Sequence, residues 1–182
     1  TRLAINVYRP AVDGKPIGSK LPTIFAFTPY RARYLDNGKL VEAFDQKIFG
    51  FRALVAAGYA VAIADIRGKG ASFGARRGFL DQTEAKDGRD LIQWIAAQPW
   101  STGKIGMIGV SYLAAVQQAA VVSGTKNLTS VFHIQAPMSY YQNGVRRNGT
   151  FIQMMVPIAF LFAATSKEAA EDPLVRKASL DS

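Results

Sequence analysis

Apolar runs of strand length recur along the first 135 residues, and segments with helical periodicity separate them. Three runs, at residues 23–28, 59–64 and 104–110, consist mainly of apolar side chains with little polar alternation. Such runs are typical of parallel strands whose two faces are both covered. A fourth run, at residues 128–134, continues the rhythm. We therefore predict the α/β class, with a mostly parallel sheet and helices on both of its faces.

The segments around these runs predict one further strand, a turn and three helices. Residues 3–8 alternate with the period of a half-buried strand, and Asp13-Gly14 predicts a turn. Asp81 and Glu84 have the spacing of a capping box at the start of a helix. The helices are expected at residues 40–57, 82–98 and 112–122.

The strand rhythm stops near residue 138. Residues 140–150 are polar and irregular, whereas the apolar run at residues 151–165 predicts a buried helical segment interrupted by Pro157. We therefore predict two regions, residues 1–138 and residues 139–182. The apolar run is too short to span a bilayer, so no membrane partner is expected.

Composition removes several classes of site. The 182 residues contain no cysteine and one histidine, which excludes disulfides, thiolate nucleophiles, cysteine-based zinc sites and histidine-rich metal sites. No metal or other cofactor is expected. The net charge of +9 comes from scattered Lys and Arg residues without a nucleic-acid-binding motif, so no nucleic-acid partner is expected.

The most informative stretch is Gly109-Val110-Ser111-Tyr112-Leu113, which lies between a predicted buried strand and a predicted helix. This is the context of a nucleophile elbow, in which a sharp turn exposes a serine hydroxyl above the sheet edge. The helix N-terminus would supply backbone N–H groups and positive potential for an oxyanion. The alternative is that Ser111 merely caps the helix.

A glycine-rich loop at residues 68–74 faintly resembles a dinucleotide-binding loop. Its third glycine comes one residue late, and a basic loop follows it instead of a helix. The loop is better interpreted as a turn that passes close to neighbouring backbone.

Several motifs together resemble those of the CocE/NonD serine hydrolases, which include cocaine-esterase-like enzymes, α-amino-acid ester hydrolases, acylases and X-Pro dipeptidyl-peptidases. The resemblance covers about residues 3–145. The motifs are Thr28-Pro29-Tyr30, the glycine-rich segment that begins at Asp65, Gln98-Pro99-Trp100, and the elbow around Ser111. The resemblance implies an α/β-hydrolase fold and hydrolysis of esters or amides of small acyl substrates through an acyl-enzyme.

The resemblance also implies three residue roles. Ser111 would attack the acyl carbon, while the backbone N–H of Tyr112 and the hydroxyl of Tyr30 would bind the oxyanion. Leu113 fits the family pattern, whereas Ala114 stands where glycine is expected.

The base and the acid of a catalytic triad are not evident in this chain. The only histidine, His133, lies inside a predicted strand, where we expect it to be structural with its nitrogen satisfied locally. The acids after Ser111 all follow His133, which is the wrong order for this fold. They are Glu168, Glu171, Asp172 and Asp181. We therefore expect an N-terminal portion of a hydrolase, with core residues 1–138, the start of a helical cap at 139–182, and no activity of its own.

Two alternatives stay open at this point, an X-Pro dipeptidyl-peptidase and a non-catalytic binding protein. One hypothesis is that some cationic loop residues attract an acyl group that bears a carboxylate, although solvated loop charge is the simpler interpretation. They are Arg31, Arg33, Lys69, Arg76, Arg77, Arg146 and Arg147. The sequence leaves homo-oligomerisation and localisation open.

Overall fold

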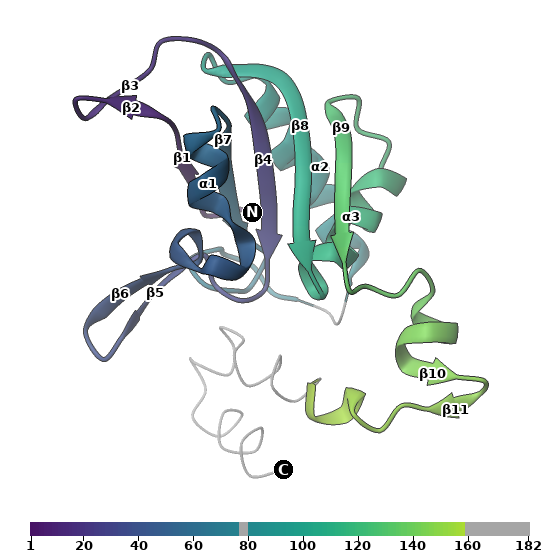
Figure 1. The fold of residues 1–182 in the computed structure, drawn as a ribbon. Helices are drawn as coiled ribbons and strands as arrows, with labels where there is room; N and C mark the ends of the chain where they lie inside the picture. Colours follow the sequence, from purple (N-terminus) through teal and green to yellow (C-terminus); the bar gives the residue numbers. More distant parts are fainter. Residues whose placement is uncertain (77–79, 159–182) are drawn as a thin grey trace.

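A five-stranded, mostly parallel sheet forms the centre of the computed structural model, which describes residues 1–76 and 80–158 (Figure 1). The strand order is β1-β7-β4-β8-β9. The strands are β1 (Ile5–Tyr8), β4 (Leu21–Thr28), β7 (Ala60–Asp65), β8 (Ser101–Val110) and β9 (Leu128–Ile134). Only β1 runs antiparallel to its neighbour within this sheet. The predicted α/β class is confirmed.

Helices cover both faces of the sheet because successive side chains of the buried strands point to opposite sides. Phe25 and Phe27 of β4 pack in one core cluster with α2 (Gln82–Ala96) and α3 (Tyr112–Val122). Ala26 belongs to a second cluster, with Phe51 of α1 (Phe51–Ala56). The central strands are therefore covered on both sides, as their apolar sequences predicted.

The prediction of one helix over residues 40–57 is wrong for most of that segment, because only α1 (Phe51–Ala56) is α-helical. The chain instead forms a hairpin of β5 (Arg33–Asp36) and β6 (Lys39–Glu42), turning at Asn37-Gly38, where φ is 48° and 76°. Two short 3₁₀ turns, Ala43–Asp45 and Lys47–Phe49, precede α1. An Asn-Gly pair favours positive φ at both turn positions, and this local signal outweighed the helical spacing of the apolar residues.

The predicted capping box at α2 is half formed. The Asp81 carboxylate accepts a hydrogen bond of 2.7 Å from the Thr83 N–H, as an N-cap should. The Glu84 side chain does not return this contact, because it points into the protein and binds Tyr112. The turn predicted at Asp13-Gly14 joins the small strands β2 (Ala11–Val12) and β3 (Lys15–Pro16).

After β9 the chain leaves the sheet (Figure 1). It forms a π-helical turn (Tyr140–Val145) and the strands β10 (Arg146–Arg147) and β11 (Thr150–Phe151). Of the predicted helical run at 151–165, residues 155–158 are helical, Phe151 is 46% exposed instead of buried, and residues from 159 onward lie outside the described part. A domain boundary near residue 138 stays a prediction.

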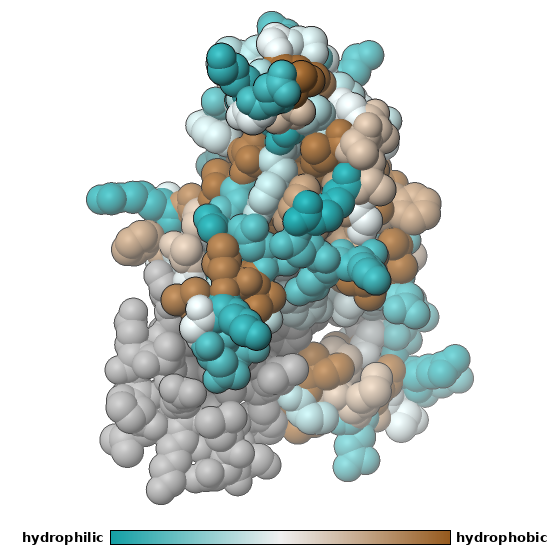
Figure 2. Space-filling model, turned by 60° about the vertical axis from the view of Figure 1, so that its left-hand side comes forward, coloured by the Kyte–Doolittle hydropathy of each residue, from teal (hydrophilic) through white to brown (hydrophobic). Residues whose placement is uncertain are grey.

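On the face shown in Figure 2, hydrophilic and hydrophobic residues are interspersed. Among the described residues, no helix has both the length and the apolar character needed to cross a bilayer.

Candidate active site

Ser111 occupies a strained turn between β8 and α3. Its backbone has φ 58° and ψ −116°, a conformation that non-glycine residues rarely adopt and that costs about 1–3 kcal/mol. The turn is held from both sides, because the Ser111 N–H donates to Ile134 O at 2.9 Å and its carbonyl accepts from the Ala115 N–H at 3.1 Å. The Ser111 side chain makes no capping hydrogen bond, and the residue is exposed. The capping interpretation of Ser111 is therefore wrong.

Gly109 makes this turn sterically feasible. A Cβ atom at Gly109 would overlap the Cβ of Leu113 in the first turn of α3. The glycine two residues before the serine is therefore required by the close approach of helix to strand. Because Gly109 has no side chain, the bulky Leu113 fits against it, although the general motif has a second glycine at the position of Leu113.

A cavity of about 290 Å³ opens beside Ser111. Apolar side chains from the segment after β9 form much of its wall, and Gln135 and Asn143 contribute amide groups. Its described lining consists of Ser111, Tyr112, Gln135, Pro137, Asn143, Gly144, Ile152, Met154, Met155 and Ile158. Gln135 also has positive φ, at 53°. None of these described lining residues is ionisable except Tyr112.

The side chain of Tyr112 is buried, and its hydroxyl joins two distant segments. The hydroxyl lies 2.8 and 2.9 Å from the two carboxylate oxygens of Glu84 in α2. It also accepts hydrogen bonds from Arg76 Nη2 at 2.7 Å and from the Leu80 N–H at 3.0 Å. These contacts fix the first residue of α3, whose backbone N–H follows the serine. Sequence reasoning missed the network, although a Tyr after the serine and a Glu in an apolar helix face were visible.

Burial sets the electrostatics of this network. Burial raises the pKa of Glu84 above its ordinary value, and the neighbouring Arg76 guanidinium opposes the rise. Burial also raises the pKa of Tyr112, and the Glu84 carboxylate adds to the effect. The Tyr112 hydroxyl therefore stays protonated and serves as a donor to the carboxylate.

Tyr30 follows β4, which is the neighbour of β8 in the parallel sheet (Figure 1). Both Tyr30 and Ser111 thus lie beyond the carboxyl ends of adjacent strands, at the edge where sites of α/β proteins are found. Tyr30 is 43% exposed, and its N–H donates to Thr28 Oγ1 at 3.0 Å. It is not among the described residues that line the cavity.

Within the described part of the chain, no hydrogen bond joins the His133 Nε2 atom to the serine. His133 lies within β9 opposite Gly109, and its Nε2 atom is buried without a hydrogen-bond partner among the described residues. The prediction that this nitrogen is satisfied locally is therefore wrong for Nε2. The candidate acids at 168, 171, 172 and 181 lie outside the described residues.

Several of the cationic loop residues have intramolecular contacts. Arg33 forms an ion pair with Glu42 at 2.8 Å, and Arg76 lies 3.3 Å from Glu84. Arg31 lies 4.0 Å above the Tyr34 ring, and Lys69 is wholly buried. Arg77 is outside the described residues. Burial removes Arg76 and Lys69 from the set of solvated cations that could attract a carboxylate, whereas the Arg33 side chain is 49% exposed.

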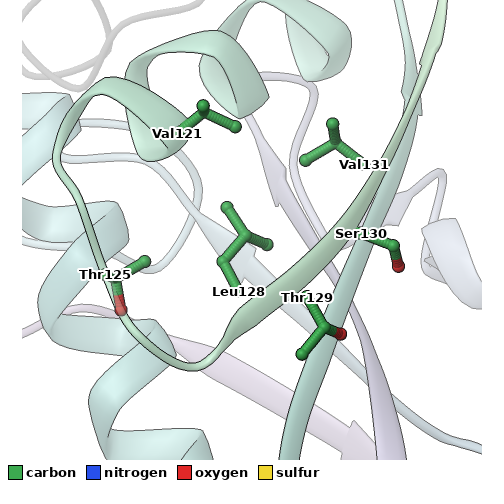
Figure 3. A pocket seen from close by; sticks show the side chains of 6 residues that line it. All are labelled: Val121, Thr125, Leu128, Thr129, Ser130 and Val131. Carbon is green, nitrogen blue, oxygen red and sulfur yellow. The ribbon is translucent and has the colours of Figure 1, made fainter.

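At the opposite end of the sheet from Ser111, a second, shallower pocket of about 180 Å³ lies at the amino-terminal half of β9. Figure 3 shows this pocket. Val121 of α3, Thr125 and residues 128–131 line it. Within residues 1–76 and 80–158, no three His, Cys, Asp or Glu side chains gather in a way that could hold a metal ion.

Comparisons of the sequence with known proteins find similar serine esterases and peptidases. A profile of the X-Pro dipeptidyl-peptidase (S15 family) matches residues 1–179. The cocaine esterase of Rhodococcus sp. (strain MB1 Bresler) is 35% identical over 141 residues, which are 78% of this chain and 22% of the esterase. A putative Xaa-Pro dipeptidyl-peptidase of Bacillus anthracis is 29% identical over 176 residues, covering 83% of this chain and 29% of the relative.

Comparisons with solved structures also find hydrolases of similar fold. A CocE/NonD family hydrolase from Staphylococcus aureus matches with a TM-score of 0.54 and 25% identity, over 71% of this chain and 24% of the hydrolase. An aminopeptidase from a marine sediment Thaumarchaeota archaeon shares the fold, with a TM-score of 0.66 and 21% identity over 91% of this chain and 28% of the aminopeptidase. This chain thus spans between about a fifth and a third of the length of these relatives.

Proposed function

This chain belongs to the X-Pro dipeptidyl-peptidase (S15) family, and we propose that Ser111 is the nucleophile of a serine hydrolase that cleaves ester or amide bonds of small acyl substrates. The observation that carries the proposal is the backbone of Ser111. A strained, exposed serine between a buried parallel strand and a helix N-terminus is the geometry that a nucleophile elbow requires.

In the proposed reaction, Ser111 Oγ attacks the acyl carbon and loses its proton to a general base. The negative charge develops on the former carbonyl oxygen, where the Tyr112 N–H and the Tyr30 hydroxyl donate hydrogen bonds. Collapse of the tetrahedral intermediate breaks the bond to the alcohol or amine, which leaves with the proton that the base had taken from Ser111. Water, which gives a proton to the same base, then attacks the acyl-enzyme, and the returned proton restores the Ser111 hydroxyl as the acid departs. Each oxyanion donor typically contributes about 2.7–4 kcal/mol of transition-state stabilisation.

His133 is not positioned to act as the general base. A general base must approach the serine hydroxyl to about 2.6–3.2 Å, directly or through one water, whereas His133 is held in β9 with Nε2 buried and unpartnered. Since this chain spans about a fifth of the length of the Rhodococcus esterase, we propose that the whole protein supplies the base and the acid from residues outside this sequence.

The cavity favours an ester or a neutral acyl substrate over an X-Pro peptide. A dipeptidyl-peptidase must bind a free N-terminal ammonium group, for which a carboxylate is the usual partner. The described lining of the cavity beside Ser111 contains no Asp or Glu. The peptidase stays the second candidate because the family profile and the Bacillus anthracis relative carry that name.

Labelling with a fluorophosphonate probe tests the proposal on the full-length protein. We expect the label on the peptide that contains Ser111, and no label after Ser111→Ala. Ser123→Ala is the matched control, because Ser123 ends the same helix and its hydroxyl donates only to Ala120 O. A folded wild-type protein that stays unlabelled would instead be a non-catalytic binding protein.

A further inference from the structure

Asp65 ends β7 and is 1% exposed, although it carries a carboxylate. One carboxylate oxygen accepts a hydrogen bond of 2.6 Å from the Ala32 N–H, and the other accepts one of 3.0 Å from the Ala71 N–H. These donors belong to two loops that leave different strands. A buried carboxylate that accepts backbone N–H groups from two loops holds both loops in a fixed position.

The first of these loops carries Tyr30. It begins at Thr28, whose carbonyl accepts from the Ile66 N–H at 3.0 Å, and it ends at Ala32, which is wholly buried. Between these two anchors the chain has only three residues, and Arg31 has φ 67°. With so few residues between fixed ends, the backbone position of Tyr30 depends directly on the hydrogen bond between Asp65 and Ala32.

The second loop, which contains Ala71, follows β7 and packs closely around the Asp65 carboxylate. Gly70 has φ 52°, and a Cβ atom there would overlap the Asp65 carboxylate. The Ser72 hydroxyl donates to the Asp65 carbonyl at 2.6 Å. The loop therefore encloses the carboxylate closely, which accounts for Gly70 without any nucleotide.

We infer that Asp65 is a positioning residue that holds the Tyr30 hydroxyl in place as an oxyanion donor. This inference rests on the proposed function of Tyr30. Asp65 does not touch the reacting atoms. It acts through the Ala32 N–H, so its loss displaces Tyr30 at the end of a short loop, and small displacements of a catalytic group are costly to the rate.

A double-mutant cycle between Asp65→Asn and Tyr30→Phe, measured on ester hydrolysis by the full-length protein, tests the inference. Tyr30→Phe should lower kcat by about 10²–10³-fold. Asp65→Asn should lower kcat by about 10–100-fold, with KM nearly unchanged. In the Tyr30→Phe background, the same Asp65 substitution should cost less than about twofold, because the donor that it positions is already absent.

Asp87→Asn is the matched control. Asp87 is also a buried carboxylate, and it accepts hydrogen bonds of 2.7 and 2.9 Å from Arg67, which directly precedes the glycine-rich loop, instead of from the loop of Tyr30. Its substitution should lower thermal stability and leave kcat within about twofold in both backgrounds. Where Asp65→Asn does not fold, Gly70→Ala replaces it in the cycle, because the added methyl group displaces the carboxylate while keeping the charge.

Four outcomes are distinguishable. Loss of kcat on Asp65→Asn that disappears in the Tyr30→Phe background supports the inference. Equal loss in both backgrounds, with Ser111 still required, overturns the role of Asp65 and leaves the hydrolase proposal standing. Hydrolysis that survives Ser111→Ala overturns the proposed function itself. Hydrolysis that requires Ser111 but is insensitive to Tyr30→Phe overturns the oxyanion role of Tyr30 and, with it, the inference about Asp65.

Discussion

The Tyr112 hydroxyl lies 2.8 Å from a carboxylate oxygen of Glu84, which joins the first residue of α3 to α2 beneath the candidate nucleophile. Arg76 contacts both partners and lies 5.5 Å from the centre of the Tyr112 ring. All three side chains are largely shielded from solvent. This network fixes the helix end that would bind the oxyanion.

Tyr112→Phe should lower the free energy of unfolding by about 1–3 kcal/mol, because it leaves the buried Glu84 carboxylate without its hydroxyl donor. Thermal and urea unfolding measure this change. Tyr141→Phe is the control, since Tyr141 is 71% exposed and its substitution should change stability by less than about 0.5 kcal/mol. Equal effects of the two substitutions would contradict a structural role for the network.

Glu84→Gln should change how stability depends on pH. The pKa of Glu84 is raised in the folded state by burial, so between its unfolded and folded pKa values the native protein binds more protons than the unfolded chain. The contribution of Glu84 to stability is therefore greatest below its unfolded pKa and is lost as pH rises through the folded pKa. Unfolding free energies from about pH 4 to pH 8 should show wild type losing stability relative to Glu84→Gln as pH rises. The opposite slope would contradict the raised pKa.

Gly109→Ala should destabilise the protein by about 1–3 kcal/mol and reduce labelling of Ser111, because the new methyl group overlaps Leu113 and pushes α3 away from β8. Gly88→Ala is the matched control. A Cβ atom at Gly88 meets only the Phe27 ring, at 3.7 Å, and the residue lies within α2, so this substitution should stabilise by about 0.5–1 kcal/mol. A stable, fully labelled Gly109→Ala protein would contradict the close approach of Leu113 to Gly109.

A butyryl ester should be hydrolysed by the full-length protein with a higher kcat/KM than a glutaryl ester. The described lining of the cavity beside Ser111 has no cationic side chain, and Arg33 and Arg76 are paired with Glu42 and Glu84. Placing a carboxylate in such a cavity without a partner is costly. A preference for the glutaryl ester would show that a cation outside this lining binds the substrate.

The sequence predicted the elements whose apolar patterns are continuous. The helix at residues 112–122 and the strand at residues 128–134 were predicted with the bounds that the structure has, and the CocE/NonD resemblance read from the motifs is confirmed. The prediction of a helix at residues 40–57 was wrong at its start, because the Asn37-Gly38 pair favours a hairpin turn and places residues 39–42 in a strand despite the helical spacing of the apolar residues.

The candidate site was predictable only in part. The elbow residues were visible as a local motif, and the structure places Ser111 in the strained turn that the motif implies. The contacts of Glu84 with Tyr112 and of Asp65 with Ala32 join residues 28 and 33 positions apart, so no local pattern encodes them. Glu84 also fits a capping box, and this local explanation concealed its role in the network.

The most direct test of the account is mass spectrometry of the full-length protein after rapid acid quenching of p-nitrophenyl ester hydrolysis. The account predicts a mass increase equal to one acyl group, located on the peptide that contains Ser111 and absent after Ser111→Ala. An acyl group on another residue, or hydrolysis that proceeds unchanged in Ser111→Ala, would contradict it.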